Sequence, residues 1–346
     1  MIQKASFKNF KILRDVSIDL QPFTVIVGPN ASGKTTVLQG LDCLSRCLSA
    51  SDGSELWTKV FQGELSTRLI YSREHQGQIE LRCTGNLENR EFEFGLALDE
   101  GGVQRIRAWV DRVEHSSFSY LAALRGYVRP AMLLRLEPRK LSAPSYPKDV
   151  GLSLPSDGEG LASVLTGLKN EYPERFSRIV EQLRSVVPNV TNVRIRRVKV
   201  EDRIGEEVVF DMLGATDVPA STASAGTLLT LGILTAVSVN DLPQLVLIDD
   251  VERGLHPKAM SSFVHQLRGI QSPQLQIVAT SHSPYLIDCM SPEEVLLTSL
   301  DEKGYAVVRP LTDHPEYERW KGLMATGEFW SSVGEDWISE EKKATA

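Results

Sequence analysis

The amino-acid sequence predicts an α/β fold with a mixed sheet, an antiparallel β layer and an inserted, mainly helical lobe. The first observation behind this prediction is the continuous apolar run Phe23–Val27, which is followed at once by a glycine-bearing loop and an amphipathic helix. Such a run is expected for a strand that is buried on both faces. The second observation is the alternation of helical and buried-strand patterns after residue 221, which is typical of a parallel sheet.

Period-2 and period-3.6 patterns place the individual elements. Towards the N-terminus we expect strands at 2–7, 15–20 and 23–27, and a helix that begins near Lys34. Gly and Asn turns separate short strand patterns within 55–110, which indicates an antiparallel layer. The remaining elements are expected in this order: helices at 159–168 and 175–187, strands within 190–212, a helix at 227–239, a strand at 244–248, a helix at 257–269, a strand at 275–279, a short helix at 284–290, and a strand pair at 294–300 and 304–310.

The two ends of the chain therefore have α/β patterns and the middle does not. The simplest organisation is a core that both ends build, with a lobe inserted between them. We expect an N-terminal part of the core at 1–114, an inserted helical lobe at 115–190, a C-terminal part of the core at 191–312, and an aromatic-bearing tail at 313–346.

Length, charge and cysteine content narrow the class of protein. The 346 residues carry a formal net charge of -7 and include four cysteines, too few for a disulfide scaffold, so we interpret them as structural thiols in a reducing cytoplasm. The N-terminus lacks the apolar core of a signal peptide, and no apolar run approaches the roughly 20 residues that span a bilayer. The sequence therefore favours a cytoplasmic protein without a membrane partner.

The segment after the strand at 23–27 matches the phosphate-loop pattern G-x-x-x-x-G-K-[ST] in full. In this pattern small residues let consecutive backbone N–H groups turn towards phosphates, and the following helix directs its positive end at them. Lys34 is expected to reach the β- and γ-phosphates, and the Thr35 hydroxyl to ligate Mg²⁺. The sequence thus predicts binding of ATP and Mg²⁺ by Gly28, Pro29, Asn30, Ala31, Ser32, Gly33, Lys34 and Thr35.

Two carboxylates, Asp249 and Asp250, end the apolar run Gln244–Ile248. The first carboxylate in such a position can hold the Mg²⁺ shell, and the next residue can orient or deprotonate an attacking water. Glu252, two residues further on, is a third candidate. An exposed acidic turn is the alternative, but the phosphate loop upstream favours the metal site.

Two further segments lie at the ends of predicted elements. Ser224-Ala225-Gly226-Thr227 opens an apolar helix, and such a start is either ordinary capping or a second anion-binding terminus. His282 follows the buried strand at 275–279, at the end of an α/β sheet where ligands bind. A lone histidine in a structural role is the alternative.

Taken in order, these segments resemble the ABC-type ATPase heads of the RecF, SMC and OLD families. The order is phosphate loop, Ser-x-Gly-Thr, Asp-Asp-x-Glu, Gly-Leu-His-Pro and Thr-Ser-His-Ser-Pro, after an opening segment, Phe7–Lys11, that is similar to the "NF" segment of those proteins. The chain looks most like the stand-alone AAA-family ATPases of the OLD/RecF type, many of which belong to bacterial anti-phage systems. The motifs cover 1–40 and 220–290; the rest is similar only in general layout.

The resemblance implies roles for the matched residues. The phosphate loop would extend to Thr36, Asp249 would be the Walker B aspartate, Asp250 would occupy the place of the catalytic glutamate, and His282 would sense the γ-phosphate. Ser224 and Gly226 would contact the γ-phosphate of ATP held by a second subunit. The resemblance thus implies a homodimer that closes around ATP, with Gly254–Pro257 at its interface.

Three departures from the family pattern matter. The usual Asp-Glu is Asp-Asp here, one methylene shorter, so either Glu252 takes the role of the base or turnover is slow and ATP serves as a clamp. The glutamine that contacts Mg²⁺ in those families has no clear equivalent in this sequence, and Gln62 is the candidate for that position. No long heptad stretch and no recognisable nuclease cluster occur, so a separately encoded effector protein is expected.

Two basic clusters and the tail allow alternative interpretations. Arginines and lysines gather at Arg194, Arg196, Arg197, Lys199 and Arg203 and at Arg125, Arg129, Arg135, Arg139 and Lys140. They could line a DNA groove through phosphate contacts, but solvated faces offset by nearby acids are favoured. The aromatic residues of 317–337 are expected to pack on the core or a partner rather than to stack on bases.

The leading hypothesis is an ATP-hydrolysing switch whose dimerisation gates an effector or DNA binding in prokaryotic defence. The second is a DNA-repair clamp of the RecF type, in which ATP closure holds DNA and hydrolysis releases it. A transporter ATPase subunit ranks third, because Ser-Ala-Gly-Thr departs from the transporter signature Leu-Ser-Gly-Gly-Gln.

Overall fold

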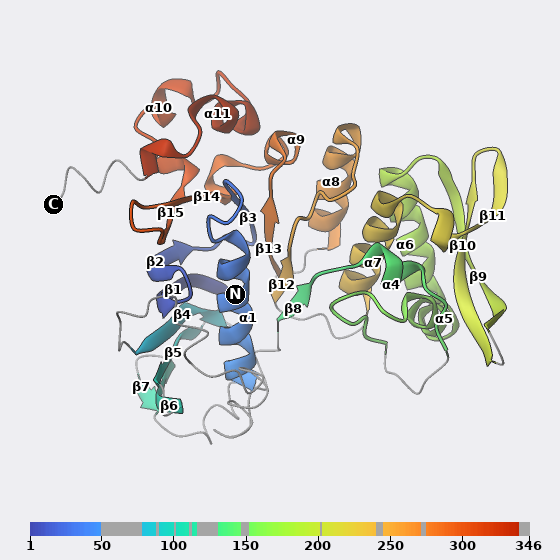
Figure 1. The fold of residues 1–346 in the computed structure, drawn as a ribbon, viewed down its shortest axis with the longest axis horizontal. Coiled ribbons are helices and arrows are strands. Elements are labelled where there is room, and N and C mark those ends of the chain that lie inside the picture. Colours follow the sequence, from blue (N-terminus) through green and yellow to red (C-terminus); the bar gives the residue numbers. More distant parts are fainter. Residues whose placement is uncertain are drawn as a thin grey trace. The chain divides into compact units, whose positions relative to one another are not determined.

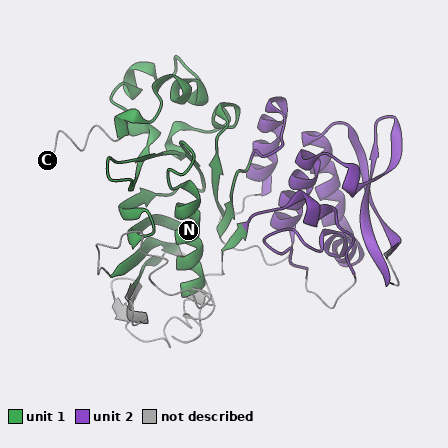
Figure 2. Ribbon diagram, in the orientation of Figure 1, with its two compact units in different colours: residues 1–133, 243–251, 273–346 green, residues 134–242, 252–272 purple. Residues whose placement is uncertain are grey.

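A computed structural model describes residues 1–49, 78–87, 90–99, 102–110, 113–115, 131–146, 152–200, 203–239, 245–270 and 275–338. Figure 1 shows the elements in chain order. The chain forms two compact units, which Figure 2 colours separately: residues 1–133, 243–251 and 273–346 form the first, and residues 134–242 and 252–272 form the second.

The first unit contains a six-stranded sheet in the order β15-β14-β3-β13-β12-β8. Its strands are β3 (Phe23–Val27), β8 (Met132–Leu134), β12 (Leu245–Ile248), β13 (Gln276–Ser281), β14 (Val295–Leu300) and β15 (Ala306–Pro310). Strands β12, β13, β3 and β14 are parallel, and β15 runs antiparallel to β14. Every residue of β3 and β12 is buried, as the continuous apolar runs predicted.

A second sheet of this unit is antiparallel, in the order β2-β1-β4-β5-β6-β7. It contains β1 (Ile2–Phe10), β2 (Leu13–Asp19), β4 (Ile79–Leu87), β5 (Arg90–Asp99), β6 (Gly102–Val110) and β7 (Val113–His115). Helix α1 (Lys34–Ser49) contacts strands of both sheets, and its apolar face joins one core that includes Phe7, Leu38 and Phe94. The expected antiparallel layer is thereby confirmed for the part of 55–110 that the structure describes.

The side chain of Gln276 connects the two sheets. Its Nε2 donates to the carbonyl oxygens of Ile2 (2.8 Å) and Gln21 (3.0 Å), and its Oε1 accepts from Ile2 N at 3.1 Å. The residue is 1% exposed, and three hydrogen bonds offset the cost of burying its amide. Strand β13, which leads to the predicted site, is thus tied to the first strand of the chain.

Residues 284–338 of the first unit include three short helices, α9 (Pro284–Ile287), α10 (Tyr317–Trp320) and α11 (Thr326–Val333). Tyr317, Phe329 and Ile338 are buried. The His314 ring meets Phe329 and Trp337 edge to face, with centroids 5.2 and 5.0 Å apart. These ring contacts join residues of the tail to one another, and α11 also contacts α9, which lies outside the tail, in line with the expected packing.

The second unit combines helices with a three-stranded antiparallel sheet, β11-β10-β9. It contains α4 (Pro138–Ser142), α5 (Leu161–Glu171), α6 (Pro173–Val186), β9 (Val190–Val200), β10 (Arg203–Met212), β11 (Ala215–Pro219), α7 (Ala225–Ser238) and α8 (Met260–Ile270). Residues 226–237 of α7 are all buried, and α6 contacts both α7 and α8.

The boundaries of the units differ from those expected. The second unit begins at Leu134 rather than at 115, and it includes β9–β11, α7 and α8, which the sequence pattern placed in the C-terminal part of the core. The reason is packing, because α7 is apolar on all sides and contacts α4, α6 and α8. Within the described residues, no helix combines the length and the apolar character that crossing a bilayer requires.

Candidate functional site: a phosphate loop facing an acidic pair

The loop between β3 and α1 has the backbone of a phosphate loop. Gly28 (φ 142°) and Gly33 (φ 107°) adopt conformations that favour glycine, and Ala31 lies in the left-handed region at φ 62°. A β-carbon on Gly28 would lie 2.2 Å from the carbonyl oxygen of Thr298. Glycine is therefore required at position 28 both by backbone angle and by space.

Thr298 of strand β14 contacts this loop, and the sequence did not identify it as a site residue. Its hydroxyl donates to the Val27 carbonyl at 3.1 Å and shares a hydrogen bond of 2.5 Å with the Ser32 hydroxyl. Both side chains are buried. Nothing in the local sequence indicated Thr298, because its importance depends on the pairing of β14 with β3.

The turn between β1 and β2 also contacts the phosphate loop and helix α1. Ile12 packs so closely that a β-carbon on Gly33 would lie 3.2 Å from its Cδ1. Lys11, in the left-handed region at φ 52°, donates from Nζ to Gln39 Oε1 on α1 at 2.7 Å. The Lys11 side chain is thus bonded to the second turn of α1.

Lys34 is the first residue of α1, and its side chain turns back to the loop. Its Nζ donates to the carbonyl oxygens of Gly28 (3.0 Å) and Pro29 (2.8 Å), and the residue is 6% exposed. The first turn of α1 carries no acidic residue, so the Lys34 ammonium and the N-terminus of this 16-residue helix both present positive charge at the loop. An anion such as phosphate fits this set of donors.

Thr35 and Asp249 meet although 214 positions separate them. The Thr35 hydroxyl donates to Asp249 Oδ1 at 3.1 Å and to Oδ2 at 3.2 Å. A hydroxyl and one carboxylate suit Mg²⁺, which keeps several waters and takes few protein ligands. Within the described residues no group of three or more His, Cys, Asp or Glu could hold a metal.

Thr280 orients the acidic pair, and the sequence analysis quoted it without giving it a role. Its hydroxyl donates to Asp249 Oδ1 at 2.7 Å and accepts from Asp250 N at 2.8 Å, and its carbonyl accepts from Val251 N at 3.0 Å. Thr280 is fully buried. The parallel register of β12 and β13, Ile248 beside Ala279, is the signal that places Thr280 next to Asp249.

Asp250 and His282 are both exposed at the same edge of the sheet. Asp250 has φ 51°, an uncommon conformation for a non-glycine residue, and such conformations are frequent at functional sites. His282 lies between Ser281, the end of β13, and Ser283, the N-cap of α9. Ser283 N donates to Ser281 Oγ at 3.0 Å, which closes a tight turn around the histidine.

Ser224, Gly226 and Glu252 belong to the second unit. Ser224 is the N-cap of α7: its Oγ accepts from Thr227 N at 3.1 Å and shares a hydrogen bond of 2.8 Å with Thr227 Oγ1. Gly226 packs against the backbone of Gly254. Glu252 is half-buried and accepts at its carbonyl from Leu255 N, so a turn follows the acidic pair directly.

Several of the basic residues form ion pairs. Arg194 binds Asp211 (2.6 Å) and Asp217 (2.7 Å), and its guanidinium lowers the pKa of Asp211. Arg196 binds Glu207 at 2.6 Å, and Lys140 binds Asp157 at 2.5 Å. Neutralised side chains are poor phosphate ligands, so at these positions the solvated, salt-bridged interpretation is favoured. Gln62, Arg125 and Arg129 lie outside the described residues.

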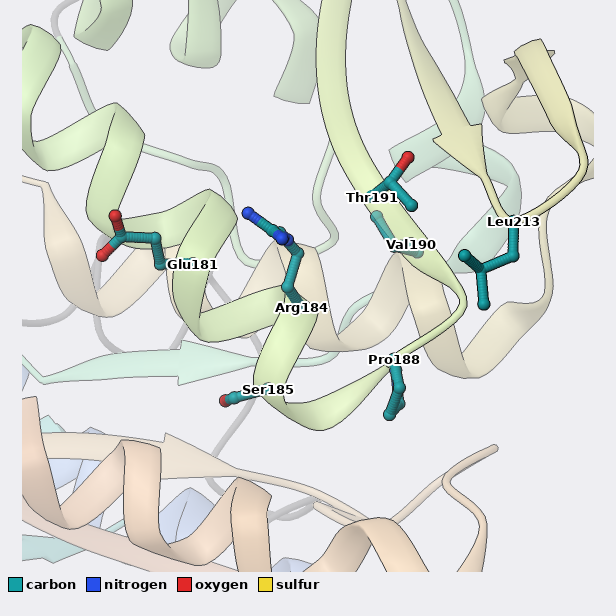
Figure 3. A pocket seen from close by; sticks show the side chains of 7 residues that line it. All are labelled: Glu181, Arg184, Ser185, Pro188, Val190, Thr191 and Leu213. Atoms are coloured by element: carbon teal, nitrogen blue, oxygen red, sulfur yellow. The ribbon is translucent and has the colours of Figure 1, made fainter.

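A hollow of about 430 Å³ lies in the second unit, where α6 ends and β9 begins (Figure 3). Glu181 and Arg184 of α6 bring opposite charges to its wall, and Leu213, which is 68% exposed, covers another side. None of the predicted site residues lines it.

The mixed sheet, with its glycine-bearing loop after β3, acidic pair after β12 and histidine after β13, has the fold of SMC-type ATPase heads. Solved structures with the same fold include an SMC head bound to the C-winged helix domain of ScpA (TM-score 0.61, 17% identity, 89% of this chain and 96% of that chain). A second is an SMC head with an extended coiled coil bound to the C-terminal domain of ScpA derived from Pyrococcus furiosus (TM-score 0.60, 14% identity, 89% and 95%).

The sequence comparisons name the family. A family model described as "AAA domain, putative AbiEii toxin, Type IV TA system" matches residues 23–288. The match spans well over half of the 346 residues, and the chain belongs to this family of AAA-domain proteins. The chain resembles ATPases of the OLD/SMC-head type in sequence and in fold.

Three known proteins are similar to this chain in sequence. The OLD nuclease of Thermus scotoductus is 25% identical over 89% of this chain and 64% of its own length. The "Retron Vc95 probable ATPase" of Vibrio cholerae serotype O1 biovar El Tor is 23% identical over 89% of this chain and 74% of its own. The Septu protein PtuA of Bacillus thuringiensis is 32% identical over 75 residues, 22% of this chain and 19% of its own length. This chain thus spans less than two thirds of the OLD nuclease.

Proposed function

We propose that this protein binds ATP with Mg²⁺ at the phosphate loop and hydrolyses it. The observation that carries the proposal is the contact between the Thr35 hydroxyl and both carboxylate oxygens of Asp249. It joins the end of the loop to the acid after β12, the two groups that P-loop ATPases use to hold the metal. Membership of an AAA-domain family supports the same conclusion.

Each residue of the site has a task in this mechanism. Backbone N–H groups of the loop and the Lys34 ammonium bind the phosphates, for which Lys34 exchanges its carbonyl partners at Gly28 and Pro29. Thr35 and Asp249 would hold Mg²⁺. Held there, the metal would supply positive charge against the negative charge that develops on the phosphate during transfer. Thr280 fixes Asp249 through its 2.7 Å hydrogen bond.

The attacking water requires a base and an orienting group. Asp250, exposed and next to the metal-binding acid, accepts the proton of that water, and Glu252 is the alternative base. His282 contacts the γ-phosphate and thus responds to its loss. These assignments follow the resemblance to ABC-type heads, in which the equivalent positions serve these roles.

Ser224 and Gly226, at the N-terminus of the 14-residue helix α7, offer a second set of N–H donors. We propose that they complete the site of a second subunit, so that a homodimer closes around two ATP molecules. Closure gates a separately encoded effector or DNA, in a prokaryotic anti-phage setting. The likeness to a retron ATPase and to the Septu protein PtuA supports that setting.

One experiment tests the core of this proposal. Phosphate release and mass by light scattering are measured with and without ATP-Mg²⁺ for the native chain, Lys34→Ala and the control Lys4→Ala, an exposed lysine of β1. The native chain and the control should hydrolyse ATP and double in mass with it, whereas Lys34→Ala should do neither. Turnover by Lys34→Ala at the native rate would refute the assignment. A mass that doubles only when duplex DNA is added would favour the DNA clamp.

A further inference from the structure

Helix α9, which begins two residues after His282, is too short to hold its own position. It has four residues, Pro284–Ile287, and isolated helices need about 12 to 15 residues to be even marginally stable in water. Its place, and that of the preceding turn at Ser281–Ser283, must be set by what packs against it.

The tail supplies that packing. The Asp288 carboxylate, just after α9, accepts from the backbone N–H groups of Gly327 (2.8 Å) and Glu328 (3.3 Å) in the first turn of α11. Thr326 Oγ1 donates to the carbonyl oxygen of Met290 at 3.0 Å. The N-terminus of α11 is thus capped by a side chain 40 positions earlier, next to the histidine segment.

The two helices also touch without side chains between them. A β-carbon on Gly327 would lie 2.0 Å from the carbonyl oxygen of Pro284, so only glycine allows this approach. The same carbonyl accepts from Asp288 N at 2.8 Å. Any displacement of α11 at Gly327 therefore moves the first residue of α9.

The tail is itself held firmly enough to act as a support. Phe329 of α11 is 4% exposed and Tyr317 of α10 is 6% exposed. Their rings pack together with centroids 6.2 Å apart, and His314 packs against Phe329. A buried aromatic cluster of this kind resists displacement.

We propose that Gly327 and Asp288 are positioning residues: they dock the C-terminal tail on α9 and thereby fix His282 at the edge of the ATP site. The inference rests on the proposed ATPase function for its kinetic consequence. Neither residue touches the phosphate loop in this arrangement, so nucleotide affinity should be independent of them. Turnover should depend on them through His282.

The test compares Gly327→Ala with the control Ser332→Ala, which removes an exposed hydroxyl from the same helix, α11. Hydrogen–deuterium exchange of 283–290 is measured first, because it needs no turnover. We expect faster exchange of this segment in Gly327→Ala and native exchange in Ser332→Ala. Native exchange in Gly327→Ala would overturn the proposal, whether or not the chain is an ATPase.

Kinetics then test the route through His282. Gly327→Ala should lower kcat by about tenfold to a hundredfold, as misplacement of a catalytic group by about 1 Å does, with unchanged affinity for ATP. In a His282→Ala background it should have no further effect. A second loss of equal size in that background would overturn the proposal. Asp288→Asn, which keeps the shape of the cap, should give the same pattern more weakly if Gly327→Ala fails to fold.

Absence of turnover in the native chain would count against the proposed ATPase, whereas the exchange measurement would still decide the docking of the tail. Turnover in the native chain that His282→Ala leaves unchanged would instead contradict the route through the histidine. The two failures are therefore distinguishable.

Discussion

The α-carbon of Gly226 faces the carbonyl oxygen of Gly254 so closely that a β-carbon on Gly226 would lie 2.1 Å from that oxygen. Gly254 has φ 75°, a conformation that favours glycine. The first turn of the helix that begins after Ser224 therefore rests directly on the turn that follows the acidic pair. The glycine of Ser-Ala-Gly-Thr has a packing reason as well as its proposed contact with phosphate.

Gly226→Ala is expected to displace the N-terminus of α7 from Gly254. Overpacking of a buried site costs about 1 to 3 kcal/mol, so thermal unfolding should shift to lower temperature. The displacement also moves the Ser224 cap, so ATP-dependent dimerisation should weaken, whereas ATP binding to the phosphate loop should stay native. Calorimetric melting and nucleotide titration measure the two effects.

Gly269→Ala is the matched control, because a β-carbon there meets nothing within 4 Å and the residue lies in helix α8. It should be neutral or slightly stabilising, since alanine favours helix over glycine. If Gly226→Ala melts and dimerises like this control, the packing argument for Gly226 is wrong.

Thr280→Val keeps the shape of a fully buried side chain and removes the hydroxyl that joins Asp249 Oδ1 and Asp250 N. Loss of these hydrogen bonds should cost about 1 kcal/mol of stability. Turnover should fall further than stability explains, because the metal-binding carboxylate is no longer oriented. Parallel measurement of unfolding in urea and of kcat separates the two.

Thr24→Val provides the comparison for this prediction. Thr24 is a buried threonine of β3, and its hydroxyl is engaged with Gln21 at the opposite end of the strand from the phosphate loop. A similar loss of stability with native kcat is expected. Equal kcat values for the two variants would contradict an orienting role of Thr280.

Local sequence predicted most of the central sheet and the phosphate loop because their signals lie within short segments. The run Phe23–Val27 and the Gly28–Thr35 pattern identify a buried strand, a loop and a helix without any knowledge of the rest of the fold. The acidic pair was found for the same reason. Its contact with Thr35 agrees with the expectation that both residues hold Mg²⁺.

Residues that act through pairing between distant segments were missed. Thr298 supports the phosphate loop and Thr280 orients Asp249 only because β14 and β13 flank β3. Local sequence patterns do not predict the order of strands in a sheet. The compact units also divide the chain at other positions than the predicted domains, because α7 is apolar on every side and its pattern cannot tell which helices cover it.

Asp250→Asn is expected to slow hydrolysis and to retain an ATP-bound dimer, because the neutral amide cannot take the proton of the attacking water. Glu252→Gln should then hydrolyse ATP nearly as the native chain does. Single-turnover phosphate release and light scattering in ATP-Mg²⁺ measure both effects. Asp313→Asn, at an exposed acid of the tail, serves as the control for charge alone.

The opposite result for the two variants would move the assignment of the base. If Glu252→Gln is slow and Asp250→Asn is native, the base lies two residues further on, in the turn that leads to Gly254. If both are native, neither carboxylate is the base, and the proposed chemistry at this edge fails while ATP binding stands.

The four cysteines should differ sharply in reactivity. Cys43, Cys47 and Cys83 are buried, and Cys289 is half-exposed. Burial raises the pKa of Cys83 to about 12 and that of Cys47 well above its usual value, and only the thiolate reacts. Ellman's reagent at pH 8 should therefore modify one thiol quickly in the native chain and all four in denaturant, and Cys289→Ser should abolish the fast phase.

The same burial predicts how stability depends on pH. The pKa of Cys83 is higher in the folded chain than in the unfolded chain, where it is about 8.5, so the unfolded state loses its proton first as pH rises. The contribution of the neutral thiol is complete below about pH 8.5 and declines between there and the folded value. The melting temperature should fall between pH 8 and pH 10, and Cys83→Ala should reduce that fall even though it lowers the melting temperature at pH 7. An unchanged pH slope in Cys83→Ala would show that this thiol is not the group that titrates on unfolding.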